Sequence, residues 1–66
     1  MREFNKVTLE IIETTGIMRF NDPNAMNAVS DEMLDGLWSC LNEVEDPKSN
    51  IKCLVITGEG RGFCAG

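Results

Sequence analysis

The chain of 66 residues carries a net charge of −5, from six Lys and Arg against eleven Asp and Glu, and 42% of its residues are hydrophobic. This length is about half of a typical domain, which disfavours a self-sufficient enzyme with a cleft and a full catalytic set. The basic residues are scattered along the chain. That pattern disfavours binding to nucleic acid or to an anionic membrane surface, because both require clustered positive charge.

The cysteines and the N-terminal residues bear on the compartment. Cys40, Cys53 and Cys64 show no CxxC spacing and the chain has no histidine, so a zinc site is not expected. Residues 1–6 contain an acid and lack the apolar stretch of a signal peptide. The apolar runs are far shorter than the ~20 residues that span a bilayer. We therefore expect a cytoplasmic protein with reduced thiols and no membrane partner.

The first part of the chain predicts a β-hairpin. Apolar and polar side chains alternate at the start of residues 6–13, which is typical of a half-buried strand. The expected apolar face holds Val7, Leu9 and Ile11, and the expected polar face holds Thr8 and Glu10. Residues 13–16 then predict a turn in which Gly16 supplies a positive φ. Residues 17–20 follow as a short second strand, antiparallel to the first.

A polar loop and an amphipathic helix come next. Residues 21–28 contain three Asn, one Asp and one Pro, a composition typical of turns. Ser30 is the expected N-cap of a helix of about four turns, which ends at Asp46-Pro47. Gly36 lies inside the helix and indicates close packing there. The apolar stripe of the helix consists of Met33, Leu34, Leu37, Trp38, Leu41 and Val44.

The last part of the chain predicts a strand followed by a glycine-rich segment. Residues 51–57 are almost continuously apolar after Lys52, which suits a parallel strand covered on both faces. Strand, helix and strand over this length fit a right-handed crossover. One helix covers only one face of such a strand, and the hairpin cannot supply the other layer. We therefore expect the segment to be the opening of a larger α/β domain.

The glycine-rich segment, residues 58–66, is the candidate for chemistry, because glycine lets the backbone approach a ligand and point N–H groups at an anion. A nucleotide loop is disfavoured, since Phe63 stands where a GxGxxG motif has its last glycine and the Gly-Lys-Ser/Thr of a P-loop is missing. The alternative is an ordinary loop that leaves a strand. Cys64 has no neighbouring base to activate it, so an inert small residue is expected.

Three other features have simpler explanations than a site. The acids of the helix are expected to form its solvated face. Trp38, Met26 and Met33 are expected to pack in the core or in loops rather than to line a ligand site.

Two segments of the chain, residues 21–30 and 55–66, resemble motifs of a known family and follow each other in the same order as in that family. Residues 55–66, Val-Ile-Thr-Gly-Glu-Gly-Arg-Gly-Phe-Cys-Ala-Gly, resemble the first signature of the crotonase superfamily, also called the enoyl-CoA hydratase/isomerase family. Residues 21–30 resemble the acyl-CoA loop of that family, an Asn-x-Pro-x-x-x-Asn-Ala-hydrophobic pattern before the first helix. One helix and one strand separate the two motifs, as in the family. The resemblance covers the chain from about residue 7 to residue 66.

The resemblance implies a fold and a function. The fold is an α/β crotonase-like (ClpP/crotonase) fold, of which residues 1–66 would be the N-terminal part, with the order ββαβ. The function is the hydration or double-bond isomerisation of an enoyl-CoA, through an enolate oxyanion that two backbone N–H groups stabilise. Coenzyme A enters as part of the substrate, and no separate cofactor is implied. The family also suggests a homo-oligomer, a trimer or a hexamer.

The same resemblance implies which residues form the site. The backbone N–H of Ala65 would be one oxyanion donor, and a small residue that ends a glycine loop suits that role. Residues 24–26 would lie along coenzyme A. Asp22 and Asn24 stand at polar positions of this loop, where some relatives carry a base that meets the CoA phosphates. The implied substrate-binding residues are Asn24, Ala25, Met26, Phe63, Cys64, Ala65 and Gly66.

The second oxyanion donor and the catalytic carboxylates of the family lie beyond Gly66, so we expect the 66 residues alone to lack activity. Two other functions stay open. One is a non-catalytic interaction segment that docks through its apolar helix stripe. The other is an acyl-CoA binder without catalysis, which would keep the loop and Ala65 but would need no downstream acid.

Overall fold

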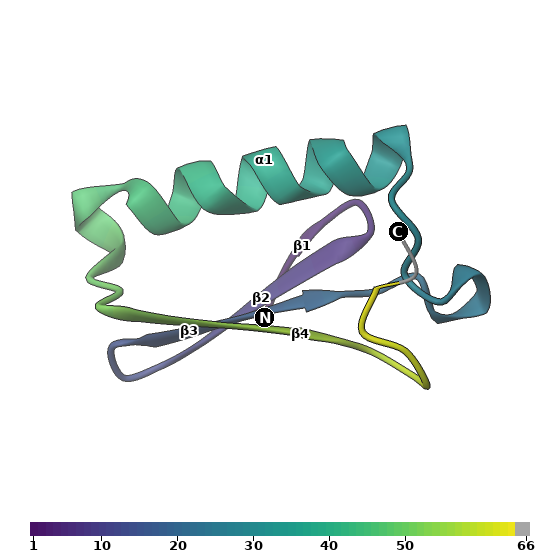
Figure 1. Ribbon diagram of the computed structural model, residues 1–66. Coiled ribbons are helices and arrows are strands. Elements are labelled where there is room, and N and C mark those ends of the chain that lie inside the picture. The colour runs from purple at the N-terminus through teal and green to yellow at the C-terminus, as the bar shows by residue number, and fades with distance from the viewer. Residues whose placement is uncertain (65–66) are drawn as a thin grey trace.

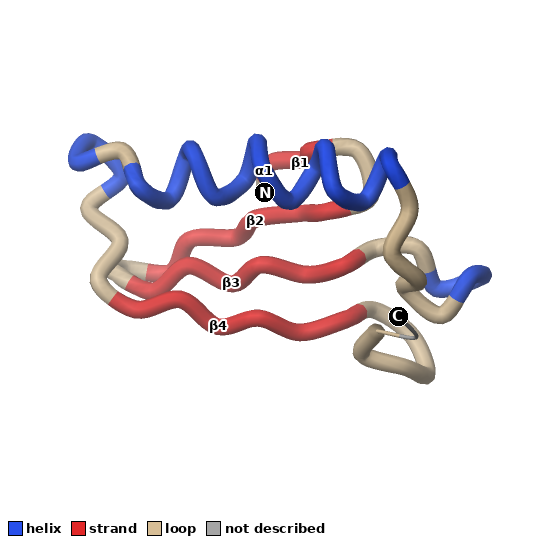
Figure 2. The backbone as a smooth tube through the Cα atoms, turned by 45° about the horizontal axis from the view of Figure 1, so that its top comes forward, coloured by secondary structure: helices blue, strands red, loops and turns tan. Residues whose placement is uncertain are grey.

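The computed structural model describes residues 1–64 as one four-stranded sheet with a single long helix packed on one face (Figures 1 and 2). The strands lie in the order β1-β2-β3-β4; the first two pairs are antiparallel, and β3 and β4 are parallel. The expected α/β arrangement and the strand–helix–strand crossover are confirmed. The elements are β1 (Arg2–Phe4), β2 (Val7–Ile12), β3 (Thr15–Phe20), the 3₁₀ turn η1 (Pro23–Ala25), α1 (Asp31–Glu45), the 3₁₀ turn η2 (Pro47–Ser49) and β4 (Cys53–Gly58).

The structure contains the predicted ββαβ order and adds one short strand, β1, before it. The three residues of β1 pair with β2, from Arg2 opposite Leu9 to Phe4 opposite Val7. A two-residue turn with Asn5 at φ 54° connects the two strands. A run of three residues is too short to show periodicity, so only its pairing with β2 makes it a strand.

The predicted hairpin of β2 and β3 is confirmed, with Leu9 opposite Met18. The turn differs from the expectation: the positive φ of 56° belongs to Glu13, while Gly16 is buried inside β3. A Cβ at Gly16 would lie 3.2 Å from Ile51 Cδ1, so this glycine makes room for the chain that leads into β4. The glycine therefore serves packing rather than the turn.

The expected alternation along β2 is wrong at two positions. Thr8 is buried, although it lies on the face away from the apolar residues, because it sits in an inner strand between Glu3 and Arg19. Ile11 is 44% exposed, because its partner across the hairpin is Gly16, which has no side chain to cover it. Periodicity shows the face to which a residue points, but the neighbours decide how far it is buried.

The helix begins and ends where the sequence predicts. Ser30 Oγ accepts a hydrogen bond from the backbone N–H of Met33 at 3.1 Å. The acids Asp31 and Glu32 lie in the first turn, where the positive end of the helix dipole stabilises their negative charge. Gly36 is buried, and a Cβ there would lie only 2.0 Å from the Phe4 carbonyl oxygen. The expected close packing at Gly36 is therefore confirmed, and β1 is the element that approaches.

The hydrophobic core lies between α1 and the first three strands. It consists of Val7, Leu9, Met18, Met33 and Cys40. Met33 thus packs in the core as expected, but Trp38 is 67% exposed and the prediction that it packs in the core or a loop is wrong. The helix is rotated so that Met33, Gly36 and Cys40 face the sheet, and the apolar stripe extends beyond the surface that the sheet covers. Within residues 1–64 no helix is long and apolar enough to cross a membrane.

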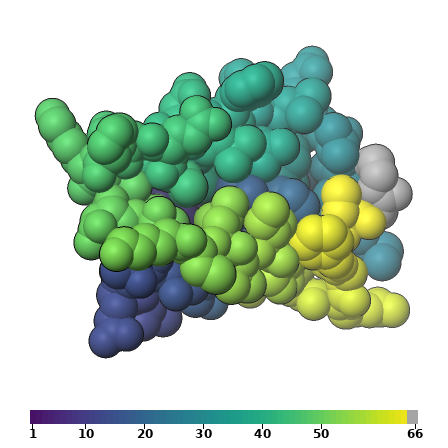
Figure 3. Space-filling view, turned by 60° about the vertical axis from the view of Figure 1, so that its left-hand side comes forward, coloured from purple at the N-terminus to yellow at the C-terminus, as the bar shows by residue number. Residues whose placement is uncertain are grey.

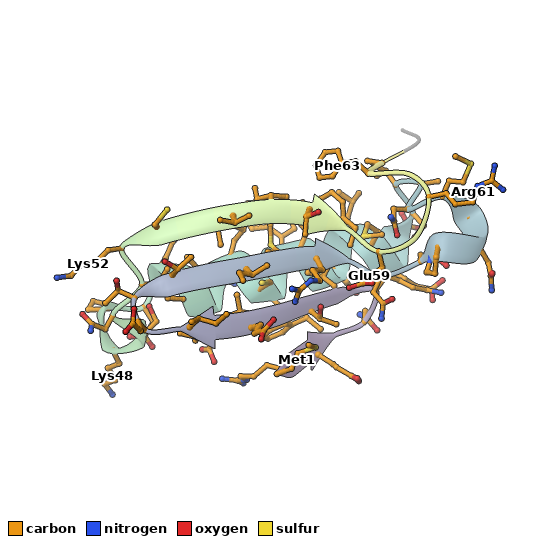
Figure 4. The ribbon with its side chains drawn as sticks, turned by 90° about the horizontal axis from the view of Figure 1, so that it is seen from below. Met1, Lys48, Lys52, Glu59, Arg61 and Phe63 are labelled. Atoms are coloured by element: carbon orange, nitrogen blue, oxygen red, sulfur yellow. The ribbon has the colours of Figure 1, made fainter. Side chains whose placement is uncertain are left out.

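Strand β4 is an edge strand with one bare face. Figure 4 shows the side of the sheet that lies away from α1, and no helix covers it within residues 1–64. Cys53 and Val55 are exposed on this side, and Ile56, on the helix side, is also 46% exposed. The expectation that one helix leaves the other face of this strand uncovered is confirmed.

Candidate functional site

The two motifs meet at one edge of the sheet. Because β3 and β4 are parallel, their carboxyl ends lie side by side, with Phe20 opposite Gly58. Residues 21–30 leave the end of β3 and residues 59–64 leave the end of β4, and Figure 1 shows the two segments together beside the start of α1. The carboxyl edge of parallel strands is where open α/β sheets bind their ligands.

The loop after β3 is a compact turn stabilised by backbone hydrogen bonds. The Asp22 carbonyl accepts from the N–H groups of Ala25 at 3.1 Å and Asn27 at 2.8 Å, and the Pro23 carbonyl accepts from Met26. Met26 and Asn27 both have positive φ values, 51° and 56°. This winding turns residues 24–26 outward, and all three are exposed to solvent.

Asp22 has an ion pair in this loop. Its Oδ1 lies 3.5 Å from Lys6 Nζ, while the Lys6 carbonyl accepts from the N–H of Asn21. The loop that resembles the acyl-CoA loop therefore carries an acid that a lysine of the β1–β2 turn neutralises in part.

Asn27 joins the two loops, and its role was missed in the sequence. The side chain is fully buried, and its Nδ2 donates to the carbonyls of Glu59 at 2.9 Å and Gly62 at 2.8 Å. Its Oδ1 accepts from the backbone N–H of Asp22 at 2.7 Å. Only its place in the Asn-Ala pair of the first motif signalled this residue, since an asparagine in a polar loop is usually a local turn former.

The glycines of the second loop allow the loops to pack against each other. A Cβ at Gly58 would lie 2.5 Å from the Phe63 carbonyl oxygen and 2.7 Å from Asn27 Nδ2. Gly60 has φ 85°, which other residues rarely adopt, and a Cβ there would lie 2.8 Å from Pro23 Cβ. The close approach that the glycines permit is therefore an approach between two segments of the chain itself.

Phe63 and Cys64 lie at the surface of this edge. The Phe63 ring packs against Phe20 with a centroid distance of 5.4 Å, and Phe63 remains 55% exposed. Cys64 is exposed as well. Figure 3 shows the last described residues, in yellow, on the surface of the molecule, and Figure 4 shows Phe63 near the end of β4. Ala65 and Gly66, which complete the predicted site, lie outside the described residues.

Charge at this edge is arranged around Glu59. Its carboxylate lies 3.4 Å from Arg19 Nε, and Arg19 also binds Glu10 of β2 at 2.7 Å. The backbone N–H of Glu59 donates to the Phe20 carbonyl at 2.8 Å, which continues the pairing of β3 and β4 by one residue. Arg61 is exposed at the tip of the loop (Figure 4). Arg19 thus attaches the loop to the face of the sheet away from α1.

The other chemical candidates lie elsewhere. Cys40 is buried in the core, and burial raises the pKa of its thiol, so it is a poor nucleophile. A pocket lies between the C-terminal half of α1 and β2, at the end of the sheet remote from the two loops. It is lined by Arg2, Ile11, Glu43, Asp46, Lys48 and Ser49. The two-loop edge is therefore the region where the predicted residues come together.

Comparison with known proteins identifies the family of the chain. The sequence pattern of the enoyl-CoA hydratase/isomerase family matches residues 10–66. The 1,2-epoxyphenylacetyl-CoA isomerase of Escherichia coli is 47% identical over 49 residues, which are 74% of this chain and 18% of that protein. A Mycobacterium tuberculosis protein named "probable enoyl-CoA hydratase EchA14" is 36% identical over 67 aligned positions, 100% of this chain and 25% of that protein.

A solved structure extends the likeness to three dimensions. The crystal structure of an enoyl-CoA hydratase/isomerase from Mycobacterium paratuberculosis matches with a TM-score of 0.87 and 35% identity. The match covers 96% of this chain and 24% of that chain. The 66 residues thus span about a quarter or less of the length of these relatives.

Proposed function

Because the chain belongs to the enoyl-CoA hydratase/isomerase family, we propose that the whole protein acts on an acyl-CoA thioester. The reaction is hydration or double-bond isomerisation of an enoyl-CoA. In either reaction negative charge collects on the thioester oxygen as an enolate forms. Backbone N–H groups aimed at that oxygen lower the barrier, because they bind the charge more strongly than the neutral substrate.

The backbone N–H of Ala65 is one of the two oxyanion donors in this proposal. Residues 24–26 lie along coenzyme A, and Phe63, Cys64 and Gly66 complete the substrate-binding edge. The donor role uses the amide of Ala65 rather than its methyl group.

One observation carries the proposal: the Asn27 side chain joins the loop after β3 to the loop after β4. This link supports a site in which the exposed residues 24–26 and the exposed Phe63–Cys64 belong to one surface. Two motifs that are far apart in the sequence thus become neighbours at a sheet edge suited to ligand binding.

The proposal includes the oligomeric state and the cellular compartment of the whole protein. The whole protein is a homo-oligomer, a trimer or a hexamer, located in the cytoplasm, and residues 1–66 are the N-terminal part of one crotonase-like domain. Three free cysteines, one of them buried, suit a reducing compartment. Val55, an apolar residue exposed on the face of β4 that α1 does not cover, supports the presence of a further layer on the sheet.

Replacement of one amide tests the proposed reaction in the whole protein. Ala65→Pro removes the N–H donor, whereas Ala65→Ser keeps it and changes only the side chain. We expect Ala65→Pro to lower kcat for hydration of a crotonyl-CoA thioester by about 100-fold or more, the usual loss of one oxyanion donor. Ala65→Ser should keep most of the activity.

Two outcomes would change this assignment. Equal kcat values for the two variants, with unchanged thermal unfolding, would remove Ala65 from the mechanism. Binding of the thioester without turnover by the unmodified whole protein would favour an acyl-CoA binder. We also expect the 66-residue chain alone to show no hydration, because the second donor and the acids are supplied by other residues.

A further inference from the structure

We propose that Asn27 is a positioning residue of the site, which acts by holding the glycine-rich loop that leads into Ala65. The inference deepens the proposed function and rests on it. Asn27 does not touch the substrate in this proposal. Its side chain fixes residues 59–62 relative to residues 22–26. It thereby restrains the segment that precedes Ala65 in the sequence.

The hydrogen bonds of Asn27 use both ends of its amide. Carbonyl oxygens only accept and a backbone N–H only donates, so the contacts with Glu59, Gly62 and Asp22 determine the orientation of the amide. The two Nδ2 bonds reach 32 and 35 residues along the sequence. Only a side chain that has both a donor and an acceptor can make the three bonds together.

The backbone of Asn27 also suits the role. Its φ of 56° lies in the left-handed region, which asparagine and aspartate adopt more readily than most residues. The side chain is fully buried, so water cannot replace a lost hydrogen bond without a change in the loops. A partly buried carbonyl left without a donor costs free energy, and the loop is expected to move to relieve it.

Movement of this loop matters because catalysis depends on small distances. A displacement of about 1 Å at a reacting group lowers the rate by about 100-fold. Gly58 shows how little space there is, since a Cβ at that position would meet both Asn27 and the Phe63 carbonyl. Loss of the Asn27 donors is therefore expected to reach the oxyanion donor through the loop.

The decisive variant is Asn27→Asp in the whole protein. It keeps the size, the tolerance for a positive φ and the acceptor for the Asp22 N–H, but it removes the two donors. Asn27→Ala removes all three side-chain bonds. Asn42→Asp makes the same chemical change at an exposed position of α1 and serves as the matched control.

Each variant is tested by steady-state hydration, by the pH profile of kcat and by limited trypsin digestion. In steady-state hydration of crotonyl-CoA at neutral pH, we expect Asn27→Asp to lower kcat by about 100-fold. The KM should change by only a few-fold, because the acceptor bond that supports residues 22–26 remains. Asn42→Asp should match the unmodified protein.

The pH profile separates positioning from general damage. An introduced carboxylate would face two carbonyl oxygens in a buried place, so its pKa would be raised. Below that pKa the protonated carboxyl group donates one hydrogen bond. The kcat of Asn27→Asp relative to the unmodified protein should therefore rise as pH falls, whereas that of Asn27→Ala should stay flat. The charged groups around Asn27 are Asp22, paired with Lys6, Glu59, paired with Arg19, and the exposed Arg61.

Limited trypsin digestion reports on the loop without reference to activity. The bond after Arg61 lies between the two carbonyls that Asn27 binds. Asn27→Asp and Asn27→Ala should therefore speed formation of the fragment that ends at Arg61, identified by its mass, by about tenfold, since loss of one hydrogen bond of about 1.4 kcal/mol corresponds to that factor.

The outcomes distinguish the two proposals. Faster cleavage after Arg61 in the two Asn27 variants, together with an unmodified protein that hydrates no thioester, would retain the loop-holding role and overturn the proposed reaction. Unchanged cleavage and unchanged kcat in both Asn27 variants would overturn the positioning role. A parallel loss of kcat in Asn27→Asp and Asn27→Ala with the same pH profile would also overturn it, because the effect would then be general destabilisation.

Discussion

Two glycines of this fold are each approached by another segment, and they show two different uses of close packing. Gly36 lies inside α1 against the Phe4 carbonyl, where the helix meets β1. Gly58 ends β4 against the Phe63 carbonyl and the Asn27 amide, where the two loops meet. The first contact joins the layers that form the core. The second joins loops that lie outside the core and present exposed residues.

The difference between the two contacts predicts which property a substitution at each glycine should change. Around Gly36 the neighbours are core residues such as Val7, so a substitution acts mainly on stability. Around Gly58 the neighbours are the Phe63 and Gly62 carbonyls and the buried Asn27 amide, which binds Gly62, so a substitution acts mainly on loop geometry.

The largest expected effect on stability is that of Gly36→Ala. At an open helix position this change stabilises a protein by up to ~1 kcal/mol. Here the new methyl group would lie 2.0 Å from a backbone oxygen, so the helix must move away from β1. We expect the free energy of unfolding of the whole protein to fall by about 3 kcal/mol, measured from the urea midpoint.

Ser39→Ala is the control for that experiment, because Ser39 is exposed on the same helix. A rise of the urea midpoint in Gly36→Ala would contradict the close approach of α1 and β1, and with it the assignment of β1 as part of the packed sheet.

The next effect separates two glycines of the same loop. A Cβ at Gly58 meets backbone oxygen and Asn27, whereas a Cβ at Gly62 meets Met26 Cε, the flexible end of a side chain, at 3.2 Å. Gly58→Ala should therefore lower kcat by about 100-fold, and Gly62→Ala should lower it only a few-fold. Steady-state hydration by the whole protein is the measurement, and equal losses would show that the loops do not depend on the packing at Gly58.

The smallest effect concerns the start of α1, which follows the first loop directly. Ser30→Ala removes the oxygen that accepts from the Met33 N–H. We expect a loss of about 1 kcal/mol in the free energy of unfolding, by thermal or urea denaturation, because the N-cap bond is local and the helix stays packed through Met33 and Cys40. A loss as large as that of Gly36→Ala would mean that the cap also supports the site loop.

Local signals accounted for much of the fold. The ends of α1 follow from Ser30 and Asp46-Pro47, and the parallel pairing of β4 follows from its apolar run after a helix. Strand β1 had no local signal, because three residues become a strand only when β2 pairs with them. Trp38 lies on the predicted apolar stripe but beyond the surface that the sheet covers.

For the candidate site, the motifs predicted which segments meet, and the structure supplies how they meet. Residues 24–26 and 63–64 were named from the motifs, and the described part of the chain brings their two loops together. Asn27 was overlooked because its partners, Glu59 and Gly62, are more than thirty residues away. Nothing in the polarity of one loop predicts a bond to the other.

The sequence by itself determined the hairpin, the helix and the parallel strand, because caps, turn residues and periodicity act over a few neighbouring positions. The family followed from the resemblance of residues 21–30 and 55–66 to two known motifs. Tertiary structure alone decided the roles of Gly16 and Gly58, the burial of Thr8 and the link through Asn27. Those features depend on which atoms approach across the sheet and between loops. Such contacts arise only when segments distant in the chain are packed together, and no local pattern encodes the distance between them.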